Sequence, residues 1–238
     1  MLNLYITSVE KKQGKTFITA GIAATMQSLG YSTSVYKPIQ TSAKKHEGFL
    51  QSPDLTFIKK IDPYINSNFS YLYKSSNEPM LAAESDNELI DLDYINNVYK
   101  RLVSTSDCTI LDGDSGLLSP IAPNTLTADL IRKLRVPVLI VVEPNQNSVN
   151  STLLTIAAAL EKGISISGVI INNIDKDCSK DLLTSISRII EEFTNIKVLG
   201  LVPKLPIDFS PEDLITATLN GVDIESIFNI KIEKLDLN

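Results

Sequence analysis

A Gly-Lys-Thr triplet at residues 14–16 is the first group in the chain that could do chemistry. It follows an apolar stretch over 2–7 and opens a stretch with helical spacing over 14–29. In such a triplet the backbone N–H groups surround phosphate oxygens, the lysine reaches the outer phosphates and the hydroxyl ligates Mg²⁺. The usual first glycine is absent, because Val9 stands at its position, so the strict motif is not met. The placement between a strand and a helix still favours phosphate binding over a plain turn with an exposed lysine.

Two further charged residues follow apolar stretches. Asp112 comes directly after 108–111, and Lys37 comes after 33–36 and precedes Pro38. Because the carboxyl ends of parallel strands share one crevice, we expect both side chains to face the triplet. The acid would support Mg²⁺ and the lysine would be a second cation for phosphates. Taken singly, each has a plainer interpretation, as an acid that caps a loop and as a lysine before a structural proline.

The elements that must position these residues alternate between two kinds. Short apolar, β-branched stretches are typical of strands covered on both faces, and they lie at 2–7, 33–36, 108–111, 136–142, 167–171 and 198–201. Stretches with helical spacing lie at 14–29, 91–103, 148–162 and 180–193, and another helix is expected to start after Ser210. The pattern predicts an α/β fold: a doubly wound, mostly parallel sheet with helices on both faces, as in P-loop NTPases. The polar segment 62–85 is expected to be a long excursion, and 231–238 an edge strand or a frayed tail.

Composition excludes several classes of protein. With 238 residues, of which 43% are hydrophobic, we expect one domain over 1–238. A net charge of -6 without a basic stripe argues against nucleic acid as a partner, and no apolar stretch approaches membrane-spanning length. Cys108 and Cys178 lie far apart, which excludes a disulfide framework or a zinc motif, and we expect Cys108 to be a core residue. The expectation is a soluble, cytoplasmic protein.

The order of the motifs resembles that of the dethiobiotin synthetase family. The loop matches when counted one residue longer, which puts its first glycine position at Ser8. The further matches run in order along 4–206: Lys37-Pro38, Ser52-Pro53-Asp54, 79–84, 112–116, Asn172-Asn173 and 200–203. No single motif is specific, but their joint order is.

The resemblance implies an ATP- and Mg²⁺-dependent ligase that closes a ureido ring from 7,8-diaminononanoate and CO₂ in biotin synthesis, and it implies a homodimer. The residues that would carry this function match the family's motifs one by one. Lys15 and Lys37 would be catalytic and hold the phosphates and the carbamate. Gln13, Gly14, Lys15, Thr16, Phe17, Asn172, Pro203 and Leu205 would bind ATP; Thr16, Asp54 and Asp112 would hold Mg²⁺; Thr41, Ser42 and Asn150 would contact the diamine, Asn150 across the dimer interface.

The chain departs from the family pattern at several loop positions. The family pattern has Thr-Glu where this chain has Lys11-Lys12, and Glu where it has Asp112. The pattern has Gly-Ala-Gly-Gly at residues 113–116 and Leu-Gly where this chain has Gln146-Asn147. Most of these positions lie at phosphate or substrate sites, so the chain could also be a diverged paralogue that binds ATP and acts on another substrate.

Two further classes of protein are disfavoured by single residues. A nucleotide-dependent switch of the partitioning type would carry a signature lysine where this chain has Glu10. A glutamine-dependent amidoligase would need a nucleophilic cysteine, and neither cysteine has a suitable setting.

Overall fold

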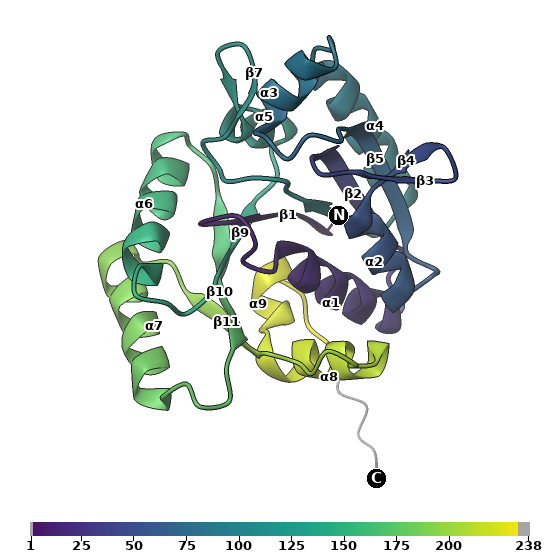
Figure 1. The fold of residues 1–238 in the computed structure, drawn as a ribbon. Helices are drawn as coiled ribbons and strands as arrows, with labels where there is room; N and C mark the ends of the chain where they lie inside the picture. The colour runs from purple at the N-terminus through teal and green to yellow at the C-terminus, as the bar shows by residue number, and fades with distance from the viewer. Residues whose placement is uncertain (1, 233–238) are drawn as a thin grey trace.

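The computed structural model describes residues 2–232, in which seven parallel strands form one sheet. The order across the sheet is β11-β10-β9-β1-β6-β2-β5 (Figure 1). These strands are β1 (Leu2–Ser8), β2 (Thr33–Gln40), β5 (Asn66–Leu72), β6 (Cys108–Asp112), β9 (Val138–Val142), β10 (Ile166–Ile174) and β11 (Val198–Pro203). Two small antiparallel pairs lie outside the sheet: β3 (Lys44–His46) with β4 (Phe49–Gln51), and β7 (Pro120–Ala122) with β8 (Thr125–Leu126).

Helices cover both faces of the sheet because alternate side chains of each buried strand point to opposite sides. On one face Leu4 and Ile6 of β1 pack in a core with α1 (Lys15–Ser28), α2 (Pro53–Ile61), α8 (Pro211–Gly221) and α9 (Ile224–Phe228). On the other face Tyr5 of β1 belongs to a core with α4 (Leu92–Thr105), α5 (Thr127–Leu134), α6 (Ser148–Glu161) and α7 (Lys180–Thr194), and with the short α3 (Pro79–Ser85). Figure 1 shows α6 and α7 on one side of the sheet and α1 and α8 on the other.

The position of β1 explains where a ligand site must lie. From β1 the chain crosses through α1 to β2 and β5, returns to β6 beside β1, and then continues on the other side with β9, β10 and β11. The direction of strand addition therefore reverses around β1. Ligands of open parallel sheets bind outside the carboxyl ends of the strands at such a reversal, which here is the turn between β1 and α1.

The predicted fold class is confirmed, and each predicted strand and helix is present within a few residues. The helix expected after Ser210 is α8, whose first turn is capped by the Ser210 side chain accepting from the backbone N–H of Asp213. Cys108 lies in the core, as expected. Among residues 2–232, no helix combines the length and the apolar character that a membrane crossing requires.

Two expectations about the chain's course are wrong. The segment 62–85 is not an excursion, because it contains the edge strand β5 and the helix α3. Strand β2 does not end before Lys37 but runs on to Gln40, with Lys37 paired to Phe69 of β5. Its pairing with β6 stops at Tyr36, so from Lys37 onward β2 is not paired with β6. The expected structure of 231–238 falls mostly on 233–238, which lie outside the described residues.

A buried side chain on the central strand gives a direct test of this architecture. Leu4 is fully buried, and Leu4→Ala is expected to lower the free energy of unfolding by about 2–5 kcal/mol, because it removes apolar contacts and leaves a cavity. Leu182→Ala on α7, where the side chain is 51% exposed, is the control and should change it by less than about 0.5 kcal/mol. Urea unfolding measures both; equal losses would contradict the assignment of β1 to the sheet centre.

Candidate active site

The turn between β1 and α1, which the sequence predicts to bind phosphates, ends in Gly14. Gly14 has φ 79°, in the left-handed region, and α1 begins at the next residue. Lys15 is only 7% exposed, and its Nζ donates to Ser8 Oγ across 3.0 Å. Burial, and then the nearby Lys37, lower the pKa of Lys15. The loop therefore holds a desolvated cation that an anionic ligand would stabilise.

Lys37 is the centre of a buried ionic cluster. Its Nζ lies 2.6 Å from Asp54 Oδ2 and 2.9 Å from Asp112 Oδ2. It also donates to the carbonyl oxygen of Gly113 across 3.0 Å. The side chain is 1% exposed, and burial alone would lower the pKa of Lys37; the carboxylates of Asp112 and Asp54 outweigh burial and raise it. The ammonium is therefore fixed in place and charged.

Each carboxylate of the cluster is held by more than Lys37. Helix α1 presents two hydroxyls to Asp112, with Thr16 Oγ1 3.0 Å from Oδ2 and Thr19 Oγ1 3.1 Å from Oδ1. Burial raises the pKa of Asp112, but these donors and Lys37 stabilise the charged form. Burial would also raise the pKa of Asp54, but the charge of Lys37 overcomes this and lowers it. Asp54 is thus a carboxylate beside the loop, and Asp112 lies in the same cluster with Lys37 and two hydroxyls on its oxygens.

The donor set of this cluster fits Mg²⁺. Magnesium takes oxygen ligands, commonly one or two carboxylates together with substrate phosphates. Thr16, Asp54 and Asp112 supply such oxygens, and the described residues contain no group of three His, Cys, Asp or Glu side chains that could hold an ion alone. Phosphate oxygens of a nucleotide would complete the coordination.

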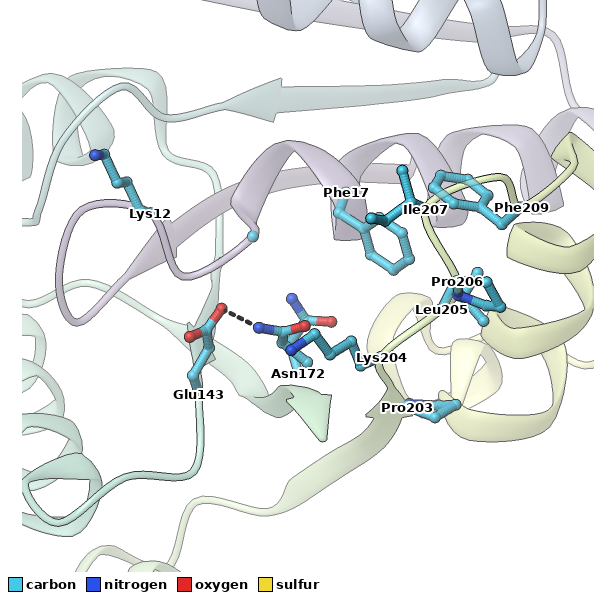
Figure 2. Close-up of a pocket in the computed structure, with 12 residues that line it drawn as sticks. Lys12, Phe17, Glu143, Asn172, Pro203, Lys204, Leu205, Pro206, Ile207 and Phe209 are labelled. Carbon is cyan, nitrogen blue, oxygen red and sulfur yellow. Dashed lines mark hydrogen bonds between the residues drawn. The ribbon is translucent and has the colours of Figure 1, made fainter. Parts of the chain in front are cut away.

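A cavity of about 310 Å³ lies on one side of the phosphate loop (Figure 2). Asn172 of β10 contributes its side chain: its Nδ2 donates to the carbonyl oxygen of Gln13 across 3.1 Å, and its Oδ1 is buried without a partner among the described residues. Phe17 of α1 packs edge-on against Phe209, with ring centroids 5.6 Å apart. The lining consists of Lys12, Gly14, Phe17, Glu143, Asn172, Asn173, Pro203, Lys204, Leu205, Pro206, Ile207 and Phe209. The cavity combines apolar walls with an amide, as a planar base requires.

A second cavity, of about 440 Å³, lies on the other side of the loop, and Lys12 and Gly14 line both cavities. It contains the ionic cluster and the end of β2. Its lining consists of Lys11, Lys12, Gly14, Lys15, Thr16, Lys37, Gln40, Thr41, Ser42, Pro53, Asp54, Ser76, Gly113 and Asp114. The two cavities together could take a base on one side of the loop and a phosphorylated centre on the other.

The structure brings most of the predicted site residues together. The second cavity is lined by Lys15, Thr16, Lys37, Thr41, Ser42 and Asp54, and Asp112 is fully buried beside Lys37. The first cavity is lined by Gly14, Phe17, Asn172, Pro203 and Leu205, and the carbonyl oxygen of Gln13 accepts from Asn172. Asn150 is apart from both: it lies in the first turn of α6, exposed, and lines neither cavity.

Sequence reasoning missed three polar residues of the site. Thr19 lies one helical turn after Thr16, so helical spacing could have found it. Glu143 directly follows β9, at the same edge of the sheet as Asp112, the last residue of β6. Its Oε1 accepts from Asn173 Nδ2 across 3.0 Å, and it lines the first cavity. Asp114 lines the second cavity, and the order of residues alone carried no signal for its contacts.

Comparison with known proteins agrees with this geometry. A family model described as an AAA domain matches residues 2–209. The ATP-dependent dethiobiotin synthetase BioD of Bacillus cereus is 28% identical over 95% of this chain and 93% of its own. That of Anoxybacillus flavithermus is 30% identical over 90% of this chain and 97% of its own. The chain belongs to the dethiobiotin synthetase family.

Solved structures show how widely the fold is shared beyond dethiobiotin synthetases. A chain of the MinC:MinD cell division protein complex of Aquifex aeolicus superposes with a TM-score of 0.63 at 16% identity, covering 100% of this chain and 98% of that one. A ParA family ATPase from Chlorobium tepidum gives a TM-score of 0.56 at 15% identity, covering 97% and 94%. At such identities the likeness shows the fold alone.

Two departures from the dethiobiotin synthetase pattern lie on the wall of the second cavity. Lys12 stands where the pattern has Glu, and Asp114 where it has Ala. Both exchanges change charge without changing the fold.

Gly14→Ala tests the contact between the loop and Asn172. A Cβ there would lie 2.1 Å from Asn172 Nδ2, so the substitution should push the amide out of position and weaken ATP binding by about tenfold or more. Gly30→Ala is the matched control, because Gly30 also has positive φ, at 90°, but a Cβ there meets nothing within 4 Å. Both should lose about 1–2 kcal/mol of unfolding free energy from backbone strain. Equal ATP affinity in the two variants, by calorimetric titration, would contradict the site.

Proposed function

We propose that this protein is an ATP- and Mg²⁺-dependent ligase that closes a ureido ring from 7,8-diaminononanoate and CO₂ to give dethiobiotin. The observation that carries the proposal is the buried Lys37 ammonium, held by Asp54 and Asp112 within the cavity that also contains Lys15. Two buried cations facing one cavity suit a reaction in which negative charge moves between phosphate and carbamate. The family relationship supports the same chemistry.

ATP would span the two cavities. Its base would lie in the first cavity, where the unpartnered Oδ1 of Asn172 can accept from an exocyclic amine and where Pro203 and Leu205 line the wall. Its triphosphate would follow the loop from Gly14 to Thr16 toward Lys37. Mg²⁺ held by Thr16, Asp54 and Asp112 would neutralise charge on the outer phosphates.

The protein would act mainly by position and charge. A carbamate is a poor electrophile until one of its oxygens is phosphorylated. The γ-phosphoryl group of ATP passes to that oxygen and ADP leaves. The second amine, as its free base, then attacks the carbonyl carbon and gives up one proton to water, and phosphate leaves with the former carbamate oxygen. Lys15 and Lys37 would hold the carbamate and γ-phosphoryl oxygens in line, and their charges would stabilise the charge that develops during both steps.

The substrate chain would extend past the end of β2. Thr41 and Ser42 line that part of the second cavity, and Asn150 would reach it only from a second copy of the chain. A groove of about 370 Å³ beside α6 supports a homodimer, because it presents the exposed Leu118 and Leu154, 52% and 62% accessible. A homodimeric enzyme of the cytoplasm is the form we propose; light scattering that finds a fully active monomer would contradict the dimer.

The test of the proposed function is ADP release that depends on diamine and bicarbonate together. Lys37→Met should lower turnover by about 100-fold or more and change ATP affinity only a few-fold, because its charge acts most strongly in the transition state. Lys45→Met is the control, since Lys45 is exposed on the β3–β4 hairpin.

Removing Lys37 also leaves two facing carboxylates, so folding must be checked in the same experiment. Urea unfolding should show a loss of about 3–5 kcal/mol for Lys37→Met, part of which Asp54→Asn in the same chain restores. Unchanged turnover in a folded Lys37→Met protein contradicts the role of Lys37. ATP hydrolysis that does not depend on the diamine indicates a nucleotide-dependent switch. Ligation of another acceptor without the diamine indicates a diverged paralogue that acts on another substrate.

A further inference from the structure

The second cavity contains a carboxylate, Asp114, that forms no ion pair among residues 2–232, although its charge acts to raise the pKa of the nearby Lys15 and Lys37. Asp114 lies two residues beyond the end of β6, and both of its oxygens accept from one residue at the end of β2. Asp114 Oδ1 lies 2.8 Å from the backbone nitrogen of Thr41, and Oδ2 lies 2.8 Å from Thr41 Oγ1. Both donors are neutral. Within residues 2–232 no lysine, arginine or histidine nitrogen forms an ion pair with Asp114.

Asp54, the other carboxylate that lines the cavity, is paired with a cation. The Lys37 ammonium lies 2.6 Å from it and neutralises it. Two contacts keep Asp114 from turning away: Thr41 binds both oxygens, and Lys37 fixes the preceding residue through the carbonyl oxygen of Gly113. A negative charge is thus fixed at the cavity wall with lone pairs left to accept further donors.

The cavity is therefore divided by charge. Lys15, Lys37 and the hydroxyl of Thr16 form a wall that suits anions. Thr41 and Asp114 form a neighbouring wall that repels phosphate and attracts a cation. A charge-assisted hydrogen bond from an ammonium group to a carboxylate is about twice as strong as a neutral one. The ligand that satisfies both walls carries an anionic group and a protonated amine within one short distance.

We propose that Asp114 is the residue that binds and orients an amine of the substrate, and so selects a compound with two closely spaced amines. This rests on the proposed function: with one amine converted to the carbamate and directed to Lys15 and Lys37, the second amine lies beside Asp114. The carboxylate binds that amine as an ammonium group and places it, and the amine gives up one proton to water before it attacks the carbonyl carbon. The two Thr41 contacts hold the carboxylate in position for it.

A substitution that keeps the shape and removes the charge tests the proposal. Asp114→Asn retains an acceptor for Thr41, whereas Thr41→Val removes one donor and leaves the carboxylate charged. Binding is followed by calorimetric titration in the presence of bicarbonate, Mg²⁺ and a non-hydrolysable ATP analogue, with three probes: 7,8-diaminononanoate, 1,2-diaminopropane and amine-free nonanoate. Asp114→Asn should weaken both diamines by about tenfold or more, and Thr41→Val by only a few-fold. Binding of nonanoate and of the ATP analogue should change by less than twofold in Asp114→Asn.

The outcomes separate this proposal from the proposed function. If the wild-type protein closes the ring and Asp114→Asn binds the diamines equally well, the amine site is wrong and the function stands. If Asp114→Asn weakens nonanoate and the ATP analogue as much as the diamines, Asp114 is only a structural link to Thr41 and the proposal fails. If the wild-type protein does not close the ring but binds 1,2-diaminopropane through Asp114, the amine site stands and the function falls. If the wild-type protein binds neither diamine, the amine site is wrong.

Discussion

A single ammonium group holds the active centre together. Lys37 Nζ contacts carboxylates from two different elements, Asp54 at the start of α2 and Asp112 at the end of β6, and a carbonyl of the following loop. Without it, two carboxylates would face each other in a buried site, which costs several kcal/mol. The same charge lies in the cavity beside Lys15, so the group that makes the cluster stable is also placed to act on phosphates.

The fold makes this arrangement possible through one topological feature. The strand order reverses around β1, so the phosphate loop after β1 lies between the ends of the neighbouring strands. Strand β2 loses its β6 partner after Tyr36, and Lys37 can therefore turn toward the end of β6. Helix α1 then fixes Asp112 with the hydroxyls of Thr16 and Thr19. The chain of the MinC:MinD complex and the ParA family ATPase share this fold.

The sequence predicts the strands and helices better than the contacts between the residues of the site. Buried parallel strands and the Gly-Lys-Thr turn have strong local signals, and the rule for strand ends placed Asp112 at the crevice. The edge strand β5 was not predicted, because its residues, Asn66–Leu72, are mostly polar and half-exposed and need pair only on one side. The contact of Asp114 with Thr41 joins residues far apart in the chain, and no local pattern reports it.

In the proposed reaction the γ-phosphoryl group of ATP passes to a carbamate oxygen held by Lys15 and Lys37. The most direct measurement is oxygen transfer, in which bicarbonate labelled with ¹⁸O is supplied with the diamine and ATP and the released phosphate is analysed by mass spectrometry. Each phosphate formed should carry one labelled oxygen, because the phosphate leaves with the carbamate oxygen. Phosphate that forms with the diamine present but takes its oxygen only from water would contradict it.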